Sequence, residues 1–133
     1  MVVKAHIWLY RVSGGKRGAK LGAMQVLLLT TRGRKSGAQR TVPIVPHIEG
    51  DQIYVIASMG GQPQHPGWFF NLEANPQVDV QLGPDHYRAR AEVLTPEQRA
   101  DVWPRITAKM PNFGAYQKKT SRVIPVVRLV REA

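Results

Sequence analysis

The sequence predicts a mainly β, α+β domain in which short antiparallel strands form a barrel or a sandwich with two short helices. Three observations support this fold class. Runs of β-branched and aromatic residues recur at short spacing, turns rich in Gly, Pro, Asn and Asp separate them, and helices do not alternate with strands as they would in a doubly wound sheet. With 133 residues, 43% of them hydrophobic and 21% charged, the chain has the size and composition of one ordinary domain.

The first 22 residues differ in character from the rest of the chain. Trp8 and Tyr10 lie among cations in residues 2–12, a pattern that predicts a short amphipathic helix. The glycine-rich, basic stretch Lys16–Gly22 predicts a connector without regular structure. We therefore divide the chain into a basic amphipathic segment, residues 1–22, and a folded domain, residues 23–133.

Strands are expected from about Met24 onward. The first predicted pair consists of Val26–Thr31 and Thr41–Val45, joined by the turn Gly33–Gly37. Because Pro43 has no N–H to donate to a neighbouring strand, the second strand of this pair is predicted to lie at an edge or to contain a bulge. The other predicted strands are Ile53–Ser58, Gln77–Leu82, His86–Leu94 and Val123–Val130.

Helices are predicted at two places. The first spans His65–Leu72 and is closed by the stop signal Asn75–Pro76. Thr95–Gln98 supplies an N-cap, a proline at the first helical position and a capping-box glutamine, so the second helix should run to about Lys109. Met110–Tyr116, which follows, is predicted to be a loop or a short helix, and it is either a lid or a packing segment that covers the open side of the barrel.

The net charge of +10 is concentrated near the N-terminus. Nine cations precede Glu49, the first acidic residue: Lys4, Arg11, Lys16, Arg17, Lys20, Arg32, Arg34, Lys35 and Arg40. After that point positive and negative charges nearly balance. The positive field of this end should attract a phosphate, a carboxylate or an anionic lipid.

Several classes of site are disfavoured by what the sequence lacks. There is no cysteine, which removes disulfides, thiolate nucleophiles and cysteine metal sites, and the four histidines are too dispersed to predict a metal site. No Gly-x-Ser-x-Gly elbow is present, so hydrolytic machinery is not expected. The apolar runs are too short for a transmembrane helix, and no signal peptide is recognised, which favours a cytoplasmic protein. Redox chemistry in such a chain would need a cofactor.

Three segments are candidates for a ligand site, each with a structural alternative. The turn Thr31–Gly37, followed by Arg40, combines glycines, hydroxyls and cations as anion-binding nests do, although a solvated hairpin tip has the same composition. Ser58–Gly61 follows a buried strand and would let the backbone approach a flat ligand, or is simply a turn. Trp68–Phe70 would wall a ring pocket, or pack in the core.

Taken together, the motifs closely resemble those of the deazaflavin-dependent nitroreductase family. The resemblance rests on Thr30-Thr31-x-Gly33-Arg34-Lys35-Ser36-Gly37-x-x-Arg40-x-x-Pro43, Ala57-Ser58-x-Gly60-Gly61, Pro66-x-Trp68-x-x-Asn71-Leu72, Asn75-Pro76, Trp103-Pro104 and Arg122-x-Ile124-Pro125-Val126-Val127. It implies a split β-barrel related to flavin-reductase-like and pyridoxamine-oxidase-like domains. It also implies binding of coenzyme F-420, a deazaflavin that carries a phosphate and a polyglutamate tail.

The resemblance also assigns cofactor-binding residues. It places beside the phosphate and tail Arg34, Lys35, Ser36, Arg40, Thr41, Val42 and Pro43. It places near the deazaflavin ring or its linker Ile56, Ala57, Ser58 and Met59, with Gly67, Trp68, Phe69 and Asn71 lining the same groove.

A substrate pocket is implied beside this groove, formed by Val45, Met110, Phe113 and Tyr116. The nitroimidazole reductase of the family has tyrosines in place of the first three and a lysine in place of Met59. These differences favour a quinone or an enone as hydride acceptor, with nitro compounds as adventitious substrates. Tyr116 is the candidate catalytic residue: it, or solvent, would supply the proton that completes the reduction.

The resemblance thus predicts an F-420-dependent oxidoreductase. Two alternatives remain: a non-catalytic F-420 carrier, and a nucleic-acid-binding domain, which is disfavoured because aromatic residues are not interleaved with the cations. The basic N-terminus, with Trp8 and Tyr10, is compatible with peripheral contact at the inner face of the cell membrane. A homodimer is compatible with the size of the domain.

Overall fold

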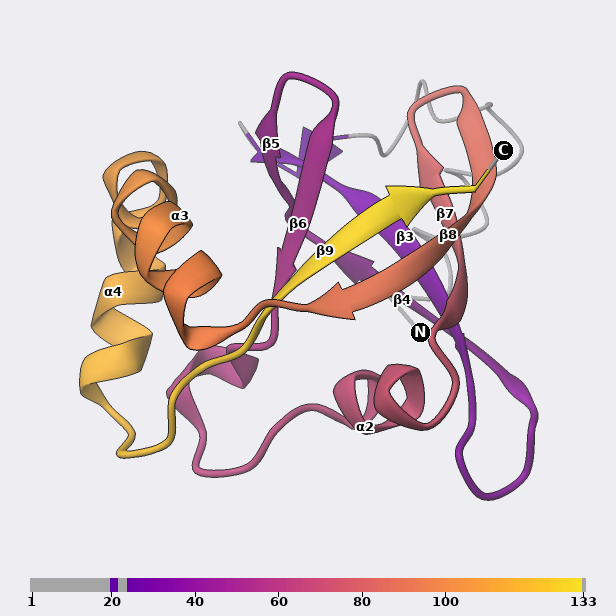
Figure 1. Cartoon of the computed structure of the whole chain (residues 1–133), viewed down its shortest axis with the longest axis horizontal. Coiled ribbons are helices and arrows are strands. Elements are labelled where there is room, and N and C mark those ends of the chain that lie inside the picture. The colour runs from indigo at the N-terminus through magenta and orange to yellow at the C-terminus, as the bar shows by residue number, and fades with distance from the viewer. Residues whose placement is uncertain (1–19, 22–23, 133) are drawn as a thin grey trace.

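The computed structural model describes residues 20–21 and 24–132, in which seven strands form one curled antiparallel sheet (Figure 1). The sheet has the order β4-β3-β7-β8-β9-β6-β5. Its strands are β3 Leu27–Arg32, β4 Gln39–Ile44, β5 His47–Glu49, β6 Gln52–Ile56, β7 Gln77–Leu82, β8 Asp85–Val93 and β9 Val126–Arg131. Every neighbouring pair is antiparallel. The sheet is a half-barrel, which confirms the predicted fold class.

A two-stranded hairpin precedes this sheet. β1 (Lys20–Leu21) pairs with β2 (Met24–Gln25). The prediction that Lys16–Gly22 lacks regular structure is therefore wrong for Lys20 and Leu21. The predicted helix in residues 2–12 lies outside the described residues. The domain boundary between residues 22 and 23 stays a prediction.

The β3–β4 hairpin forms as predicted, with Leu28 opposite Pro43 in the register. Strand β4 lies at one edge of the sheet, where the missing N–H of Pro43 costs no ladder bond. The short strand β5 at the opposite edge was not predicted. It has only three residues, and Pro46 and Gly50 flank it, so no periodic pattern marks it.

Three α-helices and one 3-10 turn accompany the strands in the described part of the chain. They are η1 Met59–Gly61, α2 Gly67–Ala74, α3 Pro96–Lys109 and α4 Pro111–Lys118. The predicted capping box of α3 is confirmed, because the Gln98 N–H donates to Thr95 Oγ1 at 3.2 Å and the Thr95 N–H donates to Gln98 Oε1 at 2.9 Å. The segment predicted as a loop or short helix after Lys109 forms α4.

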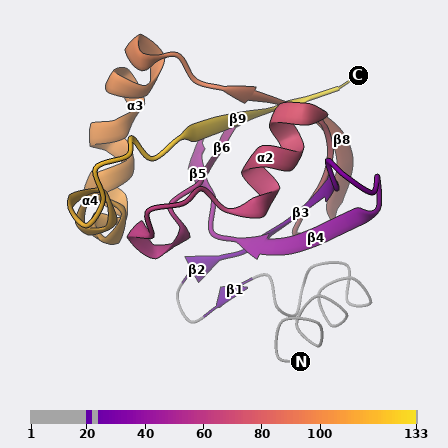
Figure 2. The same ribbon diagram turned by 90° about the horizontal axis from the view of Figure 1, so that it is seen from below.

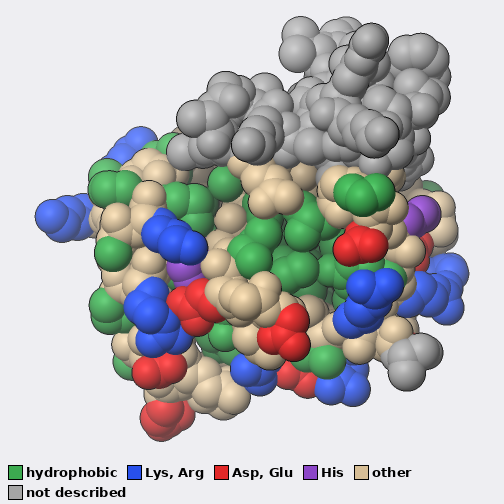
Figure 3. All heavy atoms as spheres, turned by 90° about the horizontal axis from the view of Figure 1, so that it is seen from above, with side chains coloured by type: hydrophobic (Ala, Val, Ile, Leu, Met, Phe, Trp, Pro, Cys, Tyr) green, Lys and Arg blue, Asp and Glu red, His purple; other side chains and the backbone are tan. Residues whose placement is uncertain are grey.

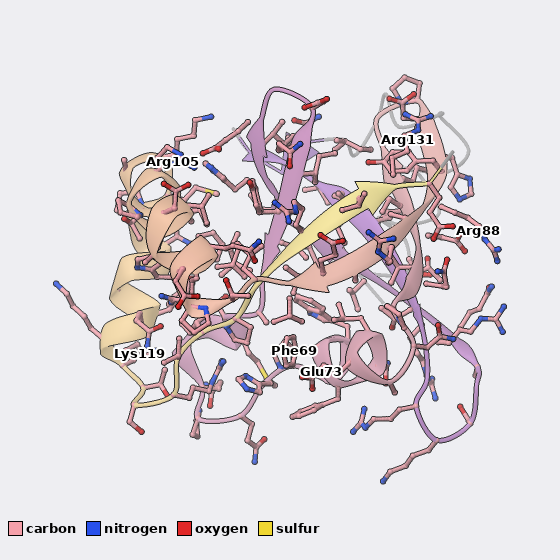
Figure 4. All side chains as sticks on the ribbon, in the orientation of Figure 1. Phe69, Glu73, Arg88, Arg105, Lys119 and Arg131 are labelled. Atoms are coloured by element: carbon pink, nitrogen blue, oxygen red, sulfur yellow. The ribbon has the colours of Figure 1, made fainter. Side chains whose placement is uncertain are left out.

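The interior of the half-barrel is the main core. Leu27, Leu29, Val55 and Val80 are almost fully buried in it. Helix α2 lies across the lower opening, as the view from below shows (Figure 2). Phe69 points from this helix toward the sheet (Figure 4) and is buried in the same core. The segment that carries the predicted site is therefore anchored by core packing.

A second core fixes α3 and α4 beside the half-barrel. Val102 and Ile106 of α3 and Phe113 of α4 pack against Tyr54 and Ile56 of β6. These contacts bury apolar area on the outer side of the sheet, and each fully buried aliphatic side chain of this kind contributes about 1.5–3 kcal/mol. The two helices consequently form a wall next to β6.

The upper end of the half-barrel is hollow. From above, hydrophobic side chains gather in the hollow with charged groups around them (Figure 3). A cavity of about 490 Å³ lies at this end, with Ile53, Leu82, Tyr87 and Leu129 among its lining residues. The Arg131 guanidinium lies 4.3 Å from the Tyr87 ring centroid. This cavity is lined by none of the residues of the predicted site.

An ion pair ties α3 to the edge strand β5. Arg105 points from α3 (Figure 4) and donates to both carboxylate oxygens of Glu49, from Nε at 2.6 Å and from Nη2 at 3.2 Å. The buried His47 ring lies 2.8 Å from the same carboxylate. Arg105 first, and then His47, lower the pKa of Glu49 to about 2.

We predict that Glu49→Gln destabilises the protein by about 1 kcal/mol near neutral pH, the upper end for a solvent-screened ion pair. A carboxyl whose folded pKa is depressed stabilises the fold above its ordinary pKa, and this contribution is lost as the pH falls from 4.5 toward 2. Urea unfolding of both proteins across this range should therefore give curves of stability against pH that converge in acid. Glu73→Gln, which removes an exposed carboxylate from α2, is the matched control. A constant difference across this range would contradict the assignment.

Candidate functional site

The basic turn between β3 and β4 is closed by its own backbone. The Gly33 N–H donates to the Ala38 carbonyl at 2.7 Å, and the Gly37 N–H donates to the Gly33 carbonyl at 2.8 Å. Gly37 has φ +75, a left-handed conformation that glycine adopts without cost. The Ser36 hydroxyl accepts the Ala38 N–H at 3.1 Å. The cations of the turn are thus carried on a defined loop.

Asn71 of α2 connects this turn to the helix. Its Oδ1 accepts from the Arg34 backbone N–H at 3.1 Å and from Arg34 Nη1 at 3.0 Å. Its Nδ2 donates to the buried Thr31 hydroxyl at 3.2 Å. Because the Asn71 side chain is buried, these bonds both satisfy its amide and hold the turn beside α2.

A cavity of about 420 Å³ lies between the turn and α2. Its lining residues are Gly33, Arg34, Lys35, Ser36, Arg40, Val42, Gly67, Trp68 and Asn71. We call it the basic chamber.

The cations of the turn differ in where they point. Arg34 is directed at the helix, since it also donates to the Gly67 carbonyl at 3.4 Å and its guanidinium lies 5.2 Å from the Phe70 ring centroid. Lys35 and Arg40 are exposed and form no ion pair within the described part of the chain. Their charge remains available to an anion.

A larger cavity of about 670 Å³ lies on the other side of Trp68. Its lining residues are Pro43, Ile44, Val45, Ile56, Ser58, Met59, Gly60, Pro66, Trp68, Met110, Asn112, Phe113 and Tyr116. We call it the apolar chamber. Trp68 lines both chambers, so they are neighbours that share one wall. A volume of this size falls within the range of small-molecule sites, about 300–1,000 Å³.

The η1 turn forms one wall of the apolar chamber with an unusual backbone. Met59, Gly60 and Gly61 have φ values of +47, +64 and +81, and Met59 is the only described residue other than glycine with a positive φ. Such a conformation costs a side-chain-bearing residue on the order of 1–2 kcal/mol, and residues held this way cluster at functional sites. The exposed Met59 side chain lines the chamber.

Tyr116 reaches the chamber from α4, where its ring lies 6.0 Å from that of Phe113 in an edge-on arrangement. The position of α4 depends on Gly61. A Cβ on Gly61 would lie 2.7 Å from the Tyr116 carbonyl oxygen and 3.1 Å from its Cα. Only glycine therefore permits this close approach of η1 to α4.

Most of the predicted site residues line one of the two chambers. Three do not. Thr41 points its hydroxyl at Thr30 across the hairpin, at 2.8 Å, and Ala57 and Phe69 are buried in the core. Alternation along β4 explains the direction of Thr41, and burial of one side of α2 explains that of Phe69. Ala57 directly follows β6 and packs in the main core.

Sequence reasoning missed several lining residues: Gly33, Ile44, Gly60, Pro66 and Asn112. Each lies within or next to a segment that the sequence marks as a candidate for the ligand site or the substrate pocket. Its position in the chain was therefore the signal that could have identified it. It also missed the role of Arg122, which holds the loop that carries Ser58. The only signal for Arg122 was its place in the motif at the start of the last strand.

Within residues 20–21 and 24–132, no group of three or more metal-ligating side chains comes together. The residues that line the two chambers can bind and orient ligands, and Tyr116 brings a hydroxyl that can donate a proton. The basic chamber suits phosphate or carboxylate groups, and the apolar chamber suits a flat ring and a second apolar molecule. In the same described part of the chain, no helix has the length and apolar character needed to span a membrane.

Comparison with known proteins identifies the family of this chain. The model of the F420H(2)-dependent quinone reductase family matches residues 2–131. The F420H(2)-dependent quinone reductase Rv1261c of Mycobacterium tuberculosis is 37% identical over 134 residues, which cover 98% of this chain and 90% of that protein.

Solved structures give the same result. A structure described as an F420-H2 dependent reductase has 40% identity and a TM-score of 0.71, covering 78% of this chain and 92% of its own. Another, described as a domain-swapped dimer, has 34% identity and a TM-score of 0.75, covering 94% and 96%. A pyridoxamine-5′-phosphate-oxidase-like protein of Listeria innocua, with 16% identity and a TM-score of 0.57 over 81% and 84%, shares the fold alone. These neighbours confirm the predicted split barrel. The chain belongs to the F420H(2)-dependent quinone reductase family.

Proposed function

We propose that this protein is an oxidoreductase that binds coenzyme F-420 and passes hydride from the reduced cofactor to a quinone. The observation that carries the proposal is the pair of chambers joined at Trp68 in a chain of this family. Lys35 and Arg40, which form no ion pair with any described residue, supply positive charge on one side. The other side supplies an apolar wall that excludes water from a ring.

The chain's own groups would bind and orient the two reactants. Lys35 and Arg40 would hold the phosphate and the glutamate carboxylates, since charge-assisted hydrogen bonds of this kind are stronger than neutral ones. Trp68 would separate the anionic tail from the ring. When bound, the reduced deazaflavin supplies a hydride, which is chemistry that side chains do not provide.

Reduction of a quinone to a hydroquinone takes one hydride and one proton. The Tyr116 hydroxyl, on the apolar chamber, is the group that we assign to deliver the proton to a quinone oxygen, with solvent restoring it. Val45, Met110 and Phe113 line the same chamber and would hold the acceptor by apolar contact. Among the residues that the structure describes, no acidic side chain lines that chamber.

A non-catalytic F-420 carrier is the second candidate. A carrier needs a tight cofactor site and no space for an acceptor. The apolar chamber of about 670 Å³ exceeds the volume of the basic chamber and contains Tyr116, which favours the enzyme. Mixing the protein and reduced F-420 with a soluble menaquinone analogue separates the two, because a carrier leaves the cofactor reduced.

Two further partners are proposed for this protein, a second copy of the chain and the membrane surface. A relative described as a domain-swapped dimer supports the proposal of a homodimer for this chain, which light scattering of the purified protein would measure. The proposed contact with the inner face of the membrane falls on Trp8 and Tyr10, outside the described residues. Sedimentation with anionic vesicles would test it.

We predict that F-420 quenches or shifts the fluorescence of this protein on titration, with much tighter binding than FMN. Lys35→Ala and Arg40→Ala should each weaken F-420 binding about tenfold, as expected for loss of roughly 1.4 kcal/mol of charge-assisted bonding. Lys118→Ala and Arg88→Ala are matched controls, because these exposed cations line neither chamber. Equal losses in all four variants would indicate a general charge effect and reject the assignment.

We predict that Tyr116→Phe lowers kcat for quinone reduction about tenfold and leaves the F-420 dissociation constant unchanged. The reason is that the substitution removes the proton donor but keeps the ring that packs on Phe113. Stopped-flow oxidation of reduced F-420, in water and in deuterium oxide, measures the effect. An unchanged kcat with the same solvent isotope effect would assign the proton to water.

A further inference from the structure

Arg122 lies in the segment between α4 and β9 and lines neither chamber. Its guanidinium donates to three backbone carbonyls of one loop: Nη1 to Ala57 at 3.2 Å, Nη2 to Ser58 at 2.7 Å and Nε to Gln62 at 2.8 Å. Nη1 also lies 2.8 Å from His65 Nδ1. One side chain therefore holds both ends of the η1 loop.

The loop that Arg122 holds is the one with the left-handed backbone at Met59, Gly60 and Gly61. A strained segment of this kind persists only where surrounding contacts fix it. The turn has two short bonds of its own, from the Gly61 N–H to the Ser58 carbonyl at 2.9 Å and from the Gln62 N–H to the Met59 carbonyl at 3.2 Å. Further hydrogen bonds to the loop come from Arg122 and from Lys119, whose ammonium donates to the Gly60 carbonyl at 3.2 Å.

Arg122 forms no ion pair within the described residues. Its charge is met by carbonyl dipoles, and burial lowers its pKa. Burial first, and the charge of Arg122 second, also lower the pKa of His65, so the ring stays neutral and its Nδ1 accepts the bond. This arrangement uses the planar fork of a guanidinium, and a lysine ammonium cannot reproduce it.

The backbone of Arg122 is tied to α4. Gln117 Nε2 donates to the Arg122 carbonyl at 2.7 Å, and Gln117 Oε1 accepts from the Ile124 N–H at 2.9 Å and from Arg99 Nη2 at 3.0 Å. Gln117 directly follows Tyr116. Arg122 thus connects the Ser58–Gly60 wall of the apolar chamber, through its side chain, with the helix that carries Tyr116, through its backbone.

We propose that Arg122 is a positioning residue that sets the distance between the Ser58–Gly60 wall and Tyr116, and thereby the geometry in which ring and acceptor meet. Its side chain acts through the loop and contacts neither reactant. The part of this inference that concerns reactants rests on the proposed function. The part that concerns the loop does not.

The test compares Arg122→Lys and Arg122→Ala with the wild type and with Arg128→Lys, a partly buried arginine that is paired with Glu92 on the sheet. Without any ligand, the backbone amide NMR signals of Met59, Gly60 and Gly61 should shift in Arg122→Lys, while those of β7 stay in place. The His65 ring should titrate at higher pH in Arg122→Ala. Unchanged loop signals in Arg122→Lys would overturn the inference whether or not the protein binds F-420.

With cofactor, Arg122→Lys should weaken F-420 binding about fivefold and lower kcat about tenfold, at a urea midpoint close to that of Arg128→Lys. Millimolar guanidinium should restore part of the activity of Arg122→Ala, whereas the same concentration of NaCl should not. If Arg122→Ala does not fold, the positioning role is tested on Arg122→Lys alone. Wild-type kcat and affinity in that variant would reject the positioning role, while failure of the wild type to bind F-420 would reject the proposed function alone.

Discussion

The site depends on one buried amide. Asn71 accepts two bonds from Arg34 and donates one to Thr31, and so joins α2 to the turn between β3 and β4. That bridge supplies the buried polar contacts between the turn and the helix, beside the surface bond from Arg34 to the Gly67 carbonyl. Phe69 and Leu72 anchor the same helix in the core. A buried amide that loses its partners costs about 1–3 kcal/mol, so the turn and the helix are held as one unit.

The same bridge divides the cations of the turn into two kinds. Arg34 donates hydrogen bonds to Asn71 and to the Gly67 carbonyl and packs over the Phe70 ring. It is therefore part of the structure that holds the turn against α2. Among the described residues, Lys35 and Arg40 have no such partners and present their charge to the basic chamber. Arg34 keeps its full charge, because its partners are neutral, but its N–H donors are directed at protein acceptors.

Local signals in the sequence were sufficient for most of the fold. The capping box at Thr95 fixed the start of α3, and the turn at Gly33–Gly37 together with the missing N–H of Pro43 indicated a hairpin at a sheet edge. Strand β5 and the pairing of β1 with β2 were missed, because strands of two or three residues are formed by contacts with neighbouring strands and carry no period of their own. The site was predicted by segment rather than by side chain. Thr41 and Phe69 lie in the correct segments but face away, since direction depends on register.

Arg122 shows the limit of such reasoning most clearly. Its partners lie 57 to 65 positions earlier in the chain, and three of them are backbone carbonyls, which no sequence pattern records. The strain at Met59 is equally invisible, because methionine gives no signal for a left-handed conformation. A strained wall and the residue that holds it belong together: the guanidinium donates to the carbonyls of Ala57, Ser58 and Gln62, which flank the three residues with positive φ. The geometry of the apolar chamber is therefore fixed by a residue outside it, as Gly61 fixes it by having no side chain.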